Sequence, residues 1–217
     1  MSMSLAQQLA AESIAAVAKG RNLQDVLAAI RAAHPELTAQ ELGALQDIAY
    51  GCQRYLGSLK YMLAQMLKKP IGNPQLESLL LAALYQLNHT RNAPHAVVNE
   101  AVENIAKIGR GQYRSFANAI LRRFLREKEQ LNAQCRRDDT AKYNFPGWWL
   151  DYMRQAYPKH WHNIVTAANG HPPLTLRINR RHGNAEGYLE KLAAEGIAGK
   201  QLLRKVFPDD WDTREYC

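Results

Sequence analysis

Hydrophobic residues recur at three- and four-residue steps through most of residues 1–140, which is the period of an α-helix with one buried face. The stripes are separated by clear start and stop signals. Gly20 follows the first stripe as a helix cap, Thr38-Ala-Gln-Glu41 forms a capping box, and Asn73-Pro74 is typical of a helix start. The pattern predicts a bundle of about seven helices, with the first five beginning near Ser4, Asn22, Thr38, Ser58 and Asn73.

The last two of these helices lie between Pro94 and Glu127 and are joined by a glycine-rich Gly-Arg-Gly loop at 109–111. Their stripes are expected to be buried: Val97, Ala101, Ile105 and Ile108 on the first, and Phe116, Ala117, Ile120, Leu121, Phe124 and Leu125 on the second. On the second helix this leaves Arg122, Arg123 and Arg126 on the opposite side. That side should face water.

The pattern changes after this bundle. Residues 132–145 are polar and carry no stripe, which predicts a linker. Two aromatic-rich helices follow, and Leu174, Leu176 and Ile178 then alternate with polar residues, which is typical of a half-buried strand. We therefore expect a mainly α protein with two domains, a helical bundle over 1–140 and a partial α+β region over 141–217.

The net charge of +8 is unevenly distributed. Residues 1–104 contain eight basic and eight acidic residues, residues 105–140 nine and four, and residues 141–217 eleven and eight. A basic excess that begins at Lys107 favours a polyanionic partner such as nucleic acid, although charge alone leaves the question open.

Three cysteines stand far apart, at Cys52, Cys135 and Cys217, without metal-ligand spacing. They favour a reducing compartment and no zinc site. The first 18 residues lack the basic start of a signal peptide, and no apolar run reaches the ~20 residues of a membrane span. We expect a cytoplasmic protein with no membrane partner.

Three runs resemble a known family: IAYGCQRYLGSLKYML (48–63), LLLAALYQLNHTRNAPHAVVNEAVENIAK (79–107) and YRSFANAILRRFLRE (113–127). They look like the NusB-like RNA-binding domain that precedes the catalytic domain in one group of ribosomal RNA methyltransferases. YNFPGWWLDYMRQAY (143–157) and NGHPPLTLRINRR (169–181) resemble the connector and strand that follow it in the 16S rRNA (cytosine-5)-methyltransferase B family (RsmB, Sun or Fmu). The resemblance covers about residues 4–195.

The resemblance implies a NusB-like bundle, a small α+β connector and 16S rRNA as the partner, with no role for DNA. In that family a Rossmann-type domain binds S-adenosylmethionine through a DACAAPGGK-type loop and uses the cysteines of a TC and a PC motif. None of these motifs occurs in this sequence. We therefore expect no catalytic residue and no cofactor site in this chain, which would stop before the catalytic domain, and S-adenosylmethionine in the full-length enzyme.

The candidate RNA-binding residues are basic and form two groups. The first comprises Lys107, Arg110, Arg114, Arg122, Arg123 and Arg126, and the second comprises Arg177, Arg180 and Arg181 beside the expected strand. Arginine forks suit phosphates, but the same side chains on a wet helix face can serve solubility alone. The tryptophans at 148, 149 and 161 could stack on unpaired bases, and their spacing favours packing between bundle and connector.

Three functions remain open at this point. The first is the rRNA-binding part of a methyltransferase. The second is a NusB-type transcription antitermination factor, a binding module without chemistry, which would have no use for residues 141–195. The third is a purely structural helical protein, which leaves the arginine clustering unexplained. The sequence does not indicate an oligomeric state.

Overall fold

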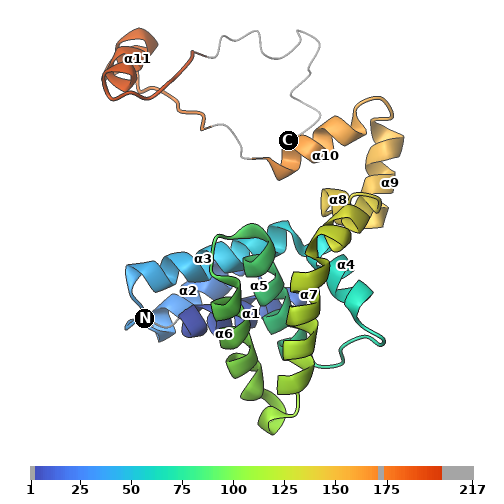
Figure 1. The fold of residues 1–217 in the computed structure, drawn as a ribbon. Coiled ribbons are helices and arrows are strands. Elements are labelled where there is room, and N and C mark those ends of the chain that lie inside the picture. The colour runs from blue at the N-terminus through green and yellow to red at the C-terminus, as the bar shows by residue number, and fades with distance from the viewer. Residues whose placement is uncertain (1–2, 171–173, 202–217) are drawn as a thin grey trace. The chain divides into compact units, whose positions relative to one another are not determined.

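The computed structural model describes residues 3–170 and 174–201, and these fall in two compact units, Met1–Gly170 and His171–Cys217 (Figure 1). Each unit is considered by itself. The helices of the first unit are α1 (Met3–Ala18), α2 (Leu23–Ala33), α3 (Ala39–Arg54), α4 (Leu56–Met66), α5 (Pro74–His89), α6 (Pro94–Ala106), the 3-10 turn η1 (Ile108–Gly111), α7 (Arg114–Cys135), α8 (Asp139–Tyr143), α9 (Gly147–Ala156) and α10 (Trp161–Asn169).

The sequence signals for helix starts are confirmed by side-chain caps. Thr38 Oγ1 accepts a hydrogen bond from Glu41 N at 3.2 Å, and Glu41 Oε2 accepts one from Thr38 N at 3.0 Å. Asn22 and Asn73 cap α2 and α5 in the same way with their side-chain oxygens. These contacts satisfy backbone donors that have no partner inside the helix. The predicted mainly α bundle is therefore confirmed.

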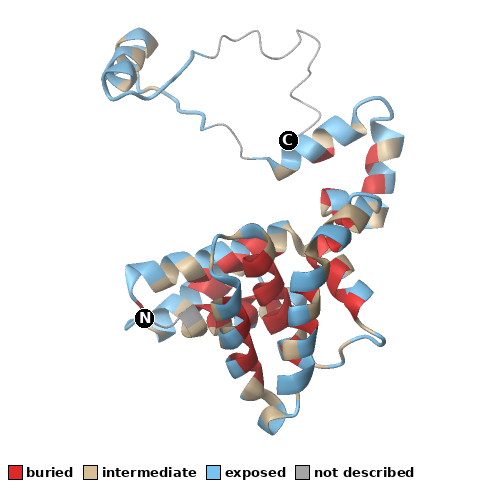
Figure 2. Ribbon diagram, in the orientation of Figure 1, coloured by how far each residue is buried: buried red, intermediate tan, exposed pale blue. Residues whose placement is uncertain are grey.

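Helix α5 lies at the centre of the bundle and contacts α1, α3, α4, α6 and α7. All ten residues from 78 to 87 are buried, so this helix is covered on every side rather than along one stripe (Figure 2). Its neighbour α3 approaches closely at Gly51, where an added Cβ would lie 2.0 Å from the Tyr85 ring. The core thus forms around α5.

The linker predicted for residues 132–145 is wrong. Helix α7 continues to Cys135, and α8 follows after a short turn. Leu131 and Cys135 extend the buried face of α7 into the main core, to which Ala141 of α8 also belongs. The polar composition of this stretch reflects the exposed sides of two packed helices.

Helix α8 docks on the start of α4 through a close backbone approach. A Cβ at Gly57 would lie 2.5 Å from the Thr140 carbonyl oxygen and 2.9 Å from Asn144 Cα. Asn144, with a positive φ of 56°, ends α8 and accepts a hydrogen bond from Ser58 N at 2.8 Å. A second, small cluster then packs around Tyr143, Leu150, Met153 and Val165 of α8, α9 and α10.

The second unit contains one helix among its described residues, α11 (Ala185–Ala194). The strand expected around Leu174, Leu176 and Ile178 is not formed: residues 174–179 carry no strand assignment, and Leu174 is 86% exposed. A strand needs a second extended segment to pair its backbone groups. The described part of this unit supplies none.

Limited proteolysis should reflect this organisation. We expect trypsin to cleave the native chain after Arg177, Arg180 or Arg181, which are exposed and outside any helix, before it cleaves after Arg136 or Arg137. The backbone amides of Arg136 and Arg137 are bonded to Asn132 O and Gln134 O at the end of α7. Mass spectrometry of the earliest fragments gives the order of cleavage. A first cleavage after Arg136 or Arg137 would support a linker over residues 132–145.

Candidate RNA-binding surface

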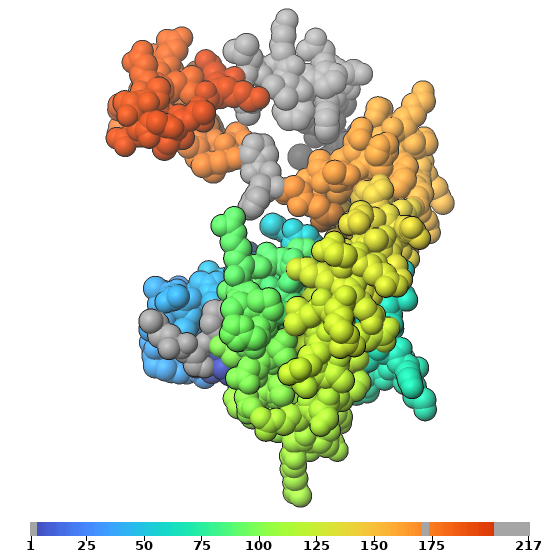
Figure 3. All heavy atoms as spheres, viewed as in Figure 1, coloured from blue at the N-terminus to red at the C-terminus, as the bar shows by residue number. Residues whose placement is uncertain are grey.

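The chain reverses between α6 and α7 through three successive residues with positive φ. These are Gly109 (59°), Arg110 (56°) and Gly111 (86°). Glycine adopts this conformation without the steric cost that a Cβ brings, so the Gly-x-Gly spacing explains the tight turn. Arg110, the one non-glycine residue among the three, is exposed at its tip. Figure 3 shows α6, this turn and α7 together on one face of the first unit.

The flanking cations Lys107 and Arg114 are exposed and make local contacts. Lys107 Nζ donates to Gln8 Oε1 at 3.2 Å and to Asn104 Oδ1 at 3.0 Å. Arg114 forms an ion pair with Glu103 across the turn. Exposed pairs of this kind contribute little to stability, so both side chains can exchange these partners for phosphate.

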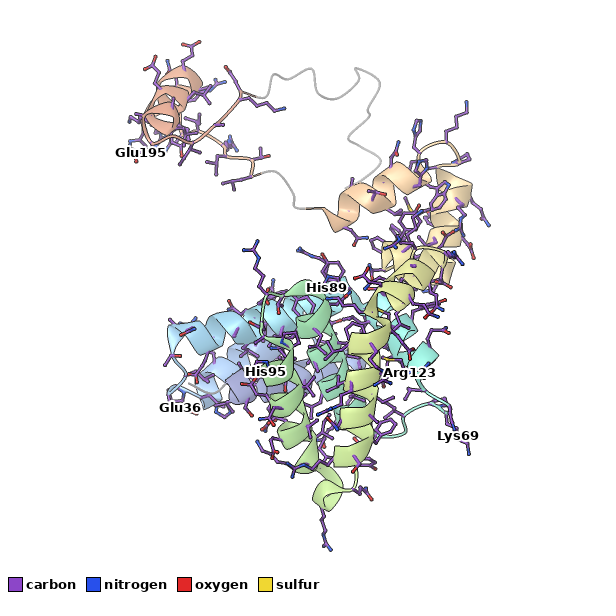
Figure 4. The ribbon with its side chains drawn as sticks, viewed as in Figure 1. Glu36, Lys69, His89, His95, Arg123 and Glu195 are labelled. Carbon is purple, nitrogen blue, oxygen red and sulfur yellow. The ribbon has the colours of Figure 1, made fainter. Side chains whose placement is uncertain are left out.

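The arginines at 122, 123 and 126 do not share one face. Arg122 and Arg126 are exposed on the outer side of α7, where Arg122 Nε donates to Asn118 Oδ1 at 3.1 Å. Arg123 instead turns toward α4 (Figure 4). Its Nη1 donates to Met66 O at 3.1 Å, and its Nε contacts the Glu127 carboxylate at 2.9 Å. Arg123 therefore fixes the end of α4 to α7.

The buried stripe predicted for α7 is also narrower than expected. Ala117, Ile120, Leu121 and Phe124 are buried, whereas Phe116 and Leu125 are each 36% exposed. These two residues stand at the edges of the stripe, on opposite sides, where neighbouring helices cover them only in part. Phe116 thereby becomes available to a groove.

This groove, here called the α1–α5–α7 groove, is a concavity of about 1120 Å³ in the first unit. Its walls come from the second half of α1, the connection between α4 and α5 with the start of α5, and the start of α7. They include Glu12, Lys19, Arg21, Lys69, Tyr113 and Phe116.

The cations of the groove, Lys19, Arg21 and Lys69, lie just before or after helix ends. Gly20, with a φ of 89°, ends α1: its N–H donates to Val17 O at 2.8 Å, and Arg21 N donates to Ala16 O at 3.2 Å. This turn holds Lys19 and Arg21 at the end of α1. Lys69 follows α4 by three residues and lies on the α4–α5 connection (Figure 4).

The groove combines three cations, one carboxylate and two aromatic rings, all within the part of the chain that the structure describes. Lysine and arginine side chains attract phosphates, and partly exposed aromatic rings offer stacking faces to unpaired bases. Sequence reasoning missed these residues because residues 1–104 carry no net charge and the cations are about 50 positions apart. The folded chain brings them together.

Arg177, Arg180 and Arg181 belong to the second unit and are all exposed. Arg180 and Arg181 lie in a turn in which Arg181 N donates to Asn179 Oδ1 at 3.0 Å. The three side chains line a concave surface beside α11. This second basic group is therefore available to a ligand within its own unit.

Two tryptophans pack inside the α8–α10 cluster. Trp149 stacks on Phe145 with ring centroids 4.3 Å apart, and Trp161 meets Tyr143 edge-on at 5.5 Å. The spacing of the three tryptophans favours packing between bundle and connector. Trp149 and Trp161 instead pack against the small cluster of α8, α9 and α10, and Trp148 is 72% exposed.

The buried thiols are poor candidates for chemistry. Burial raises the pKa of Cys52, and it raises the pKa of Cys135 to about 11, so both stay protonated and unreactive near neutral pH. Cys217 lies outside the described residues. Within residues 3–170 and 174–201 there is no cluster of metal-ligating side chains, and no helix there is long and apolar enough to cross a bilayer.

Two family models match the chain. The NusB family matches residues 4–126, and the ferredoxin-like domain of RsmF/B-like methyltransferases matches residues 145–209. The first covers the bundle and the second begins beside α9.

Curated relatives match most of this chain. The chain is 37% identical over 190 residues to the ribosomal RNA small subunit methyltransferase B of Pectobacterium carotovorum subsp. carotovorum (strain PC1), covering 85% of this chain and 44% of the relative. The proteins of the same name from Serratia proteamaculans (strain 568) and Escherichia coli (strain K12) are 35% and 33% identical over 193 and 196 residues, covering 87% and 89% of this chain and 45% of each relative.

The chain thus spans less than half the length of the curated relatives it matches. In this chain a NusB-family match is followed by a match to a ferredoxin-like domain. The helical bundle, its capped helices and the family match over residues 4–126 agree. The chain belongs to the NusB family.

Proposed function

We propose that this chain is the RNA-binding N-terminal part of an S-adenosylmethionine-dependent 16S rRNA (cytosine-5)-methyltransferase that acts in the cytoplasm. Its bundle would hold ribosomal RNA while a domain outside this chain methylates a cytosine. The observation that carries the proposal is the pairing of a NusB-family bundle with a methyltransferase-type ferredoxin-like domain in one chain. The names of the relatives support the same conclusion.

The main alternative, a NusB-type antitermination factor, accounts for the bundle but not for the second region. That region matches a methyltransferase-type domain over residues 145–209. The alternative would be favoured if the chain is pulled down from transcription complexes together with a ribosomal protein and shows no binding to rRNA.

The glycines of the α6–α7 turn do not form a nucleotide-type cofactor loop. Such a loop follows a strand and opens a helix, whereas Gly109 and Gly111 join two helices. S-adenosylmethionine is proposed for the full-length protein, and no step of its chemistry is placed on these residues.

Within this proposal, RNA contacts the exposed cations at the α6–α7 turn, the outer arginines of α7 and the α1–α5–α7 groove. Arg110, Arg122 and Arg126 are exposed and basic, and the groove adds Lys19, Arg21 and Lys69. Arg123 contributes mainly through its contacts with Met66 and Glu127. The basic group at 177–181 would contact RNA within its own unit. The domain division at residue 140 stays a prediction.

Salt dependence separates phosphate contacts from packing. The double variant Arg122→Ala/Arg126→Ala should lower the slope of log K against log salt by roughly 1.5 for a 16S rRNA fragment, at ~0.7–0.9 per lost phosphate contact. Fluorescence anisotropy at several salt concentrations measures the slope.

Two controls accompany this variant. Arg31→Ala removes an exposed charge from α2 and should leave the slope unchanged. Arg123→Ala should lower the free energy of unfolding by about 1 kcal/mol through the lost hydrogen bond to Met66 O, with little effect on the slope. Equal slopes for the double variant and the wild type would remove Arg122 and Arg126 from the site.

A further inference from the structure

A cluster of three nearly parallel rings lies at the end of α5 and contains none of the site residues predicted from the sequence. Tyr55 and His89 stack with centroids 3.9 Å apart and planes 10° from parallel. Tyr85 lies 5.6 Å from His89 and 6.3 Å from Tyr55, with planes within 25° of both. The cluster joins the junction of α3 and α4 to the last two turns of α5.

One ring of this cluster is structural. Tyr85 is 6% exposed, packs directly over Gly51, and donates its hydroxyl hydrogen to Asp47 Oδ1 at 3.1 Å. Burial raises the pKa of this hydroxyl, and the nearby Asp47 charge adds to the effect. The hydroxyl therefore stays protonated and keeps its hydrogen bond to Asp47. Tyr85 therefore forms a rigid support for the other two rings.

The outermost ring is that of His89, an exposed residue labelled in Figure 4. Tyr55 covers one face of its imidazole. Had Tyr55 and Tyr85 covered opposite faces of the imidazole, their centroids would be separated by nearly the sum of their distances to His89. The observed 6.3 Å is well below that sum. Tyr85 therefore lies beside the imidazole, and these two rings leave its outer face open.

Hydrogen bonds hold the imidazole in place. Asn132 Nδ2 donates to Lys128 O at 2.9 Å and to Asn88 Oδ1 at 3.0 Å, which fixes the orientation of both amides. Asn88 Nδ2 is then the atom that lies 3.1 Å from His89 Nε2, so this nitrogen accepts a hydrogen bond. Burial, together with the charge of Lys128, lowers the pKa of His89, which agrees with a neutral ring.

Two exposed arginines lie close in sequence to Tyr55 and His89, whereas the Asp47 carboxylate contacts the buried Tyr85. Arg54 directly precedes Tyr55, Arg91 follows His89 by two residues, and both are exposed. A flat, neutral ring with an open face, flanked by arginines, matches an unpaired nucleobase and its phosphates. An acidic peptide would pair with the arginines but has no need of a neutral imidazole held flat, and an apolar peptide would use neither arginine.

We infer that His89, backed by Tyr55, is a stacking platform for an unpaired base of a bound RNA strand. The inference rests on the proposed RNA-binding function and adds a contact at a separate place on the bundle. It concerns base stacking, whereas the cations described above contact phosphates.

The 217-residue chain is titrated with single-stranded oligoadenylate and with a ribose-phosphate oligomer of the same length that lacks bases. His89→Ala should weaken binding to oligoadenylate about tenfold, the order expected for one lost base stack. Because the imidazole is neutral, the salt slope should not change. Binding of the abasic oligomer should be the same for wild type and variant.

His89→Trp should retain the affinity for oligoadenylate, since it keeps an aromatic face. His95→Ala is the matched control: it removes an exposed histidine from the start of α6 that stacks on no other ring among the described residues. If His89→Ala and His95→Ala bind oligoadenylate with equal affinity, the stacking platform is wrong. It is also wrong if His89→Ala weakens binding to the abasic oligomer as much as binding to oligoadenylate. Failure of the wild type to bind either oligomer would contradict the proposed function itself.

Discussion

Replacing Gly57 by alanine is expected to lower the free energy of unfolding by about 2 kcal/mol, because overpacking of a closed interface costs roughly 1–3 kcal/mol. The added Cβ would meet backbone atoms, the Thr140 carbonyl oxygen at 2.5 Å and Asn144 Cα at 2.9 Å. Backbone atoms cannot rotate away as a side chain can. The start of α4 and the end of α8 must separate, with loss of the hydrogen bond from Ser58 N to Asn144 Oδ1.

The matched control is Gly43→Ala. Gly43 also lies within a helix, α3, but a Cβ there meets nothing within 4 Å. Alanine should therefore stabilise the protein by up to about 1 kcal/mol through helix propensity. Thermal unfolding should show a decrease of about 4–8 °C for Gly57→Ala, at roughly 2–4 °C per kcal/mol for a chain of this size. A rise for both variants would mean that α8 does not pack against α4.

Removal of the groove cations should have the largest effect on RNA binding. The triple variant Lys19→Ala/Arg21→Ala/Lys69→Ala is expected to weaken binding to a 16S rRNA fragment by roughly 30- to 100-fold and to lower the salt slope by roughly 2–3. The reason is that the three residues line one concavity, so an RNA backbone passing through it would lie near all of them. Titrations of the same RNA at several salt concentrations give both quantities.

The control triple variant Arg31→Ala/Lys60→Ala/Lys159→Ala removes the same charge from exposed positions that do not line the groove. It should bind with nearly unchanged affinity, because exposed charges more than a Debye length from the RNA are largely screened. If the two triple variants lose affinity equally, the effect is one of net charge and the groove has no special role.

Helix boundaries could be predicted because they depend on local chemistry. The Thr38–Glu41 capping box, the Asn73-Pro74 start and the Gly109/Gly111 turn each act over a few residues, and each is present in the structure. The mainly α class follows from the same short-range patterns.

The wrong predictions for the linker, the α7 stripe and the strand have a common physical cause. Burial of a residue depends on neighbours that are distant in the sequence. Leu131 and Cys135 lie seven and eleven residues after the buried Phe124, a continuation of the α7 stripe that the polar composition of 132–145 concealed. Phe116 and Leu125 fit the stripe by spacing, but no neighbouring helix covers them fully. Leu174 and Leu176 alternate like a strand without a partner among the described residues.

The sequence indicates only part of the candidate site for the same reason. The α6–α7 turn and the outer arginines of α7 are close together in sequence, so they could be proposed from it. The groove unites the end of α1 with the α4–α5 connection, and Arg123 contacts Met66, which is 57 positions away. Contacts of this range follow from the packing of the helices around α5.

The central claim is that the bundle holds ribosomal RNA through its exposed cations. The most direct test measures the affinity of the 217-residue chain for a 16S rRNA fragment over a range of salt concentrations, with duplex DNA of equal length as competitor. The account predicts binding whose log K falls linearly with log salt, with a slope of at least roughly 4 in magnitude, and weak competition by DNA. No binding, or an affinity independent of salt, would contradict it.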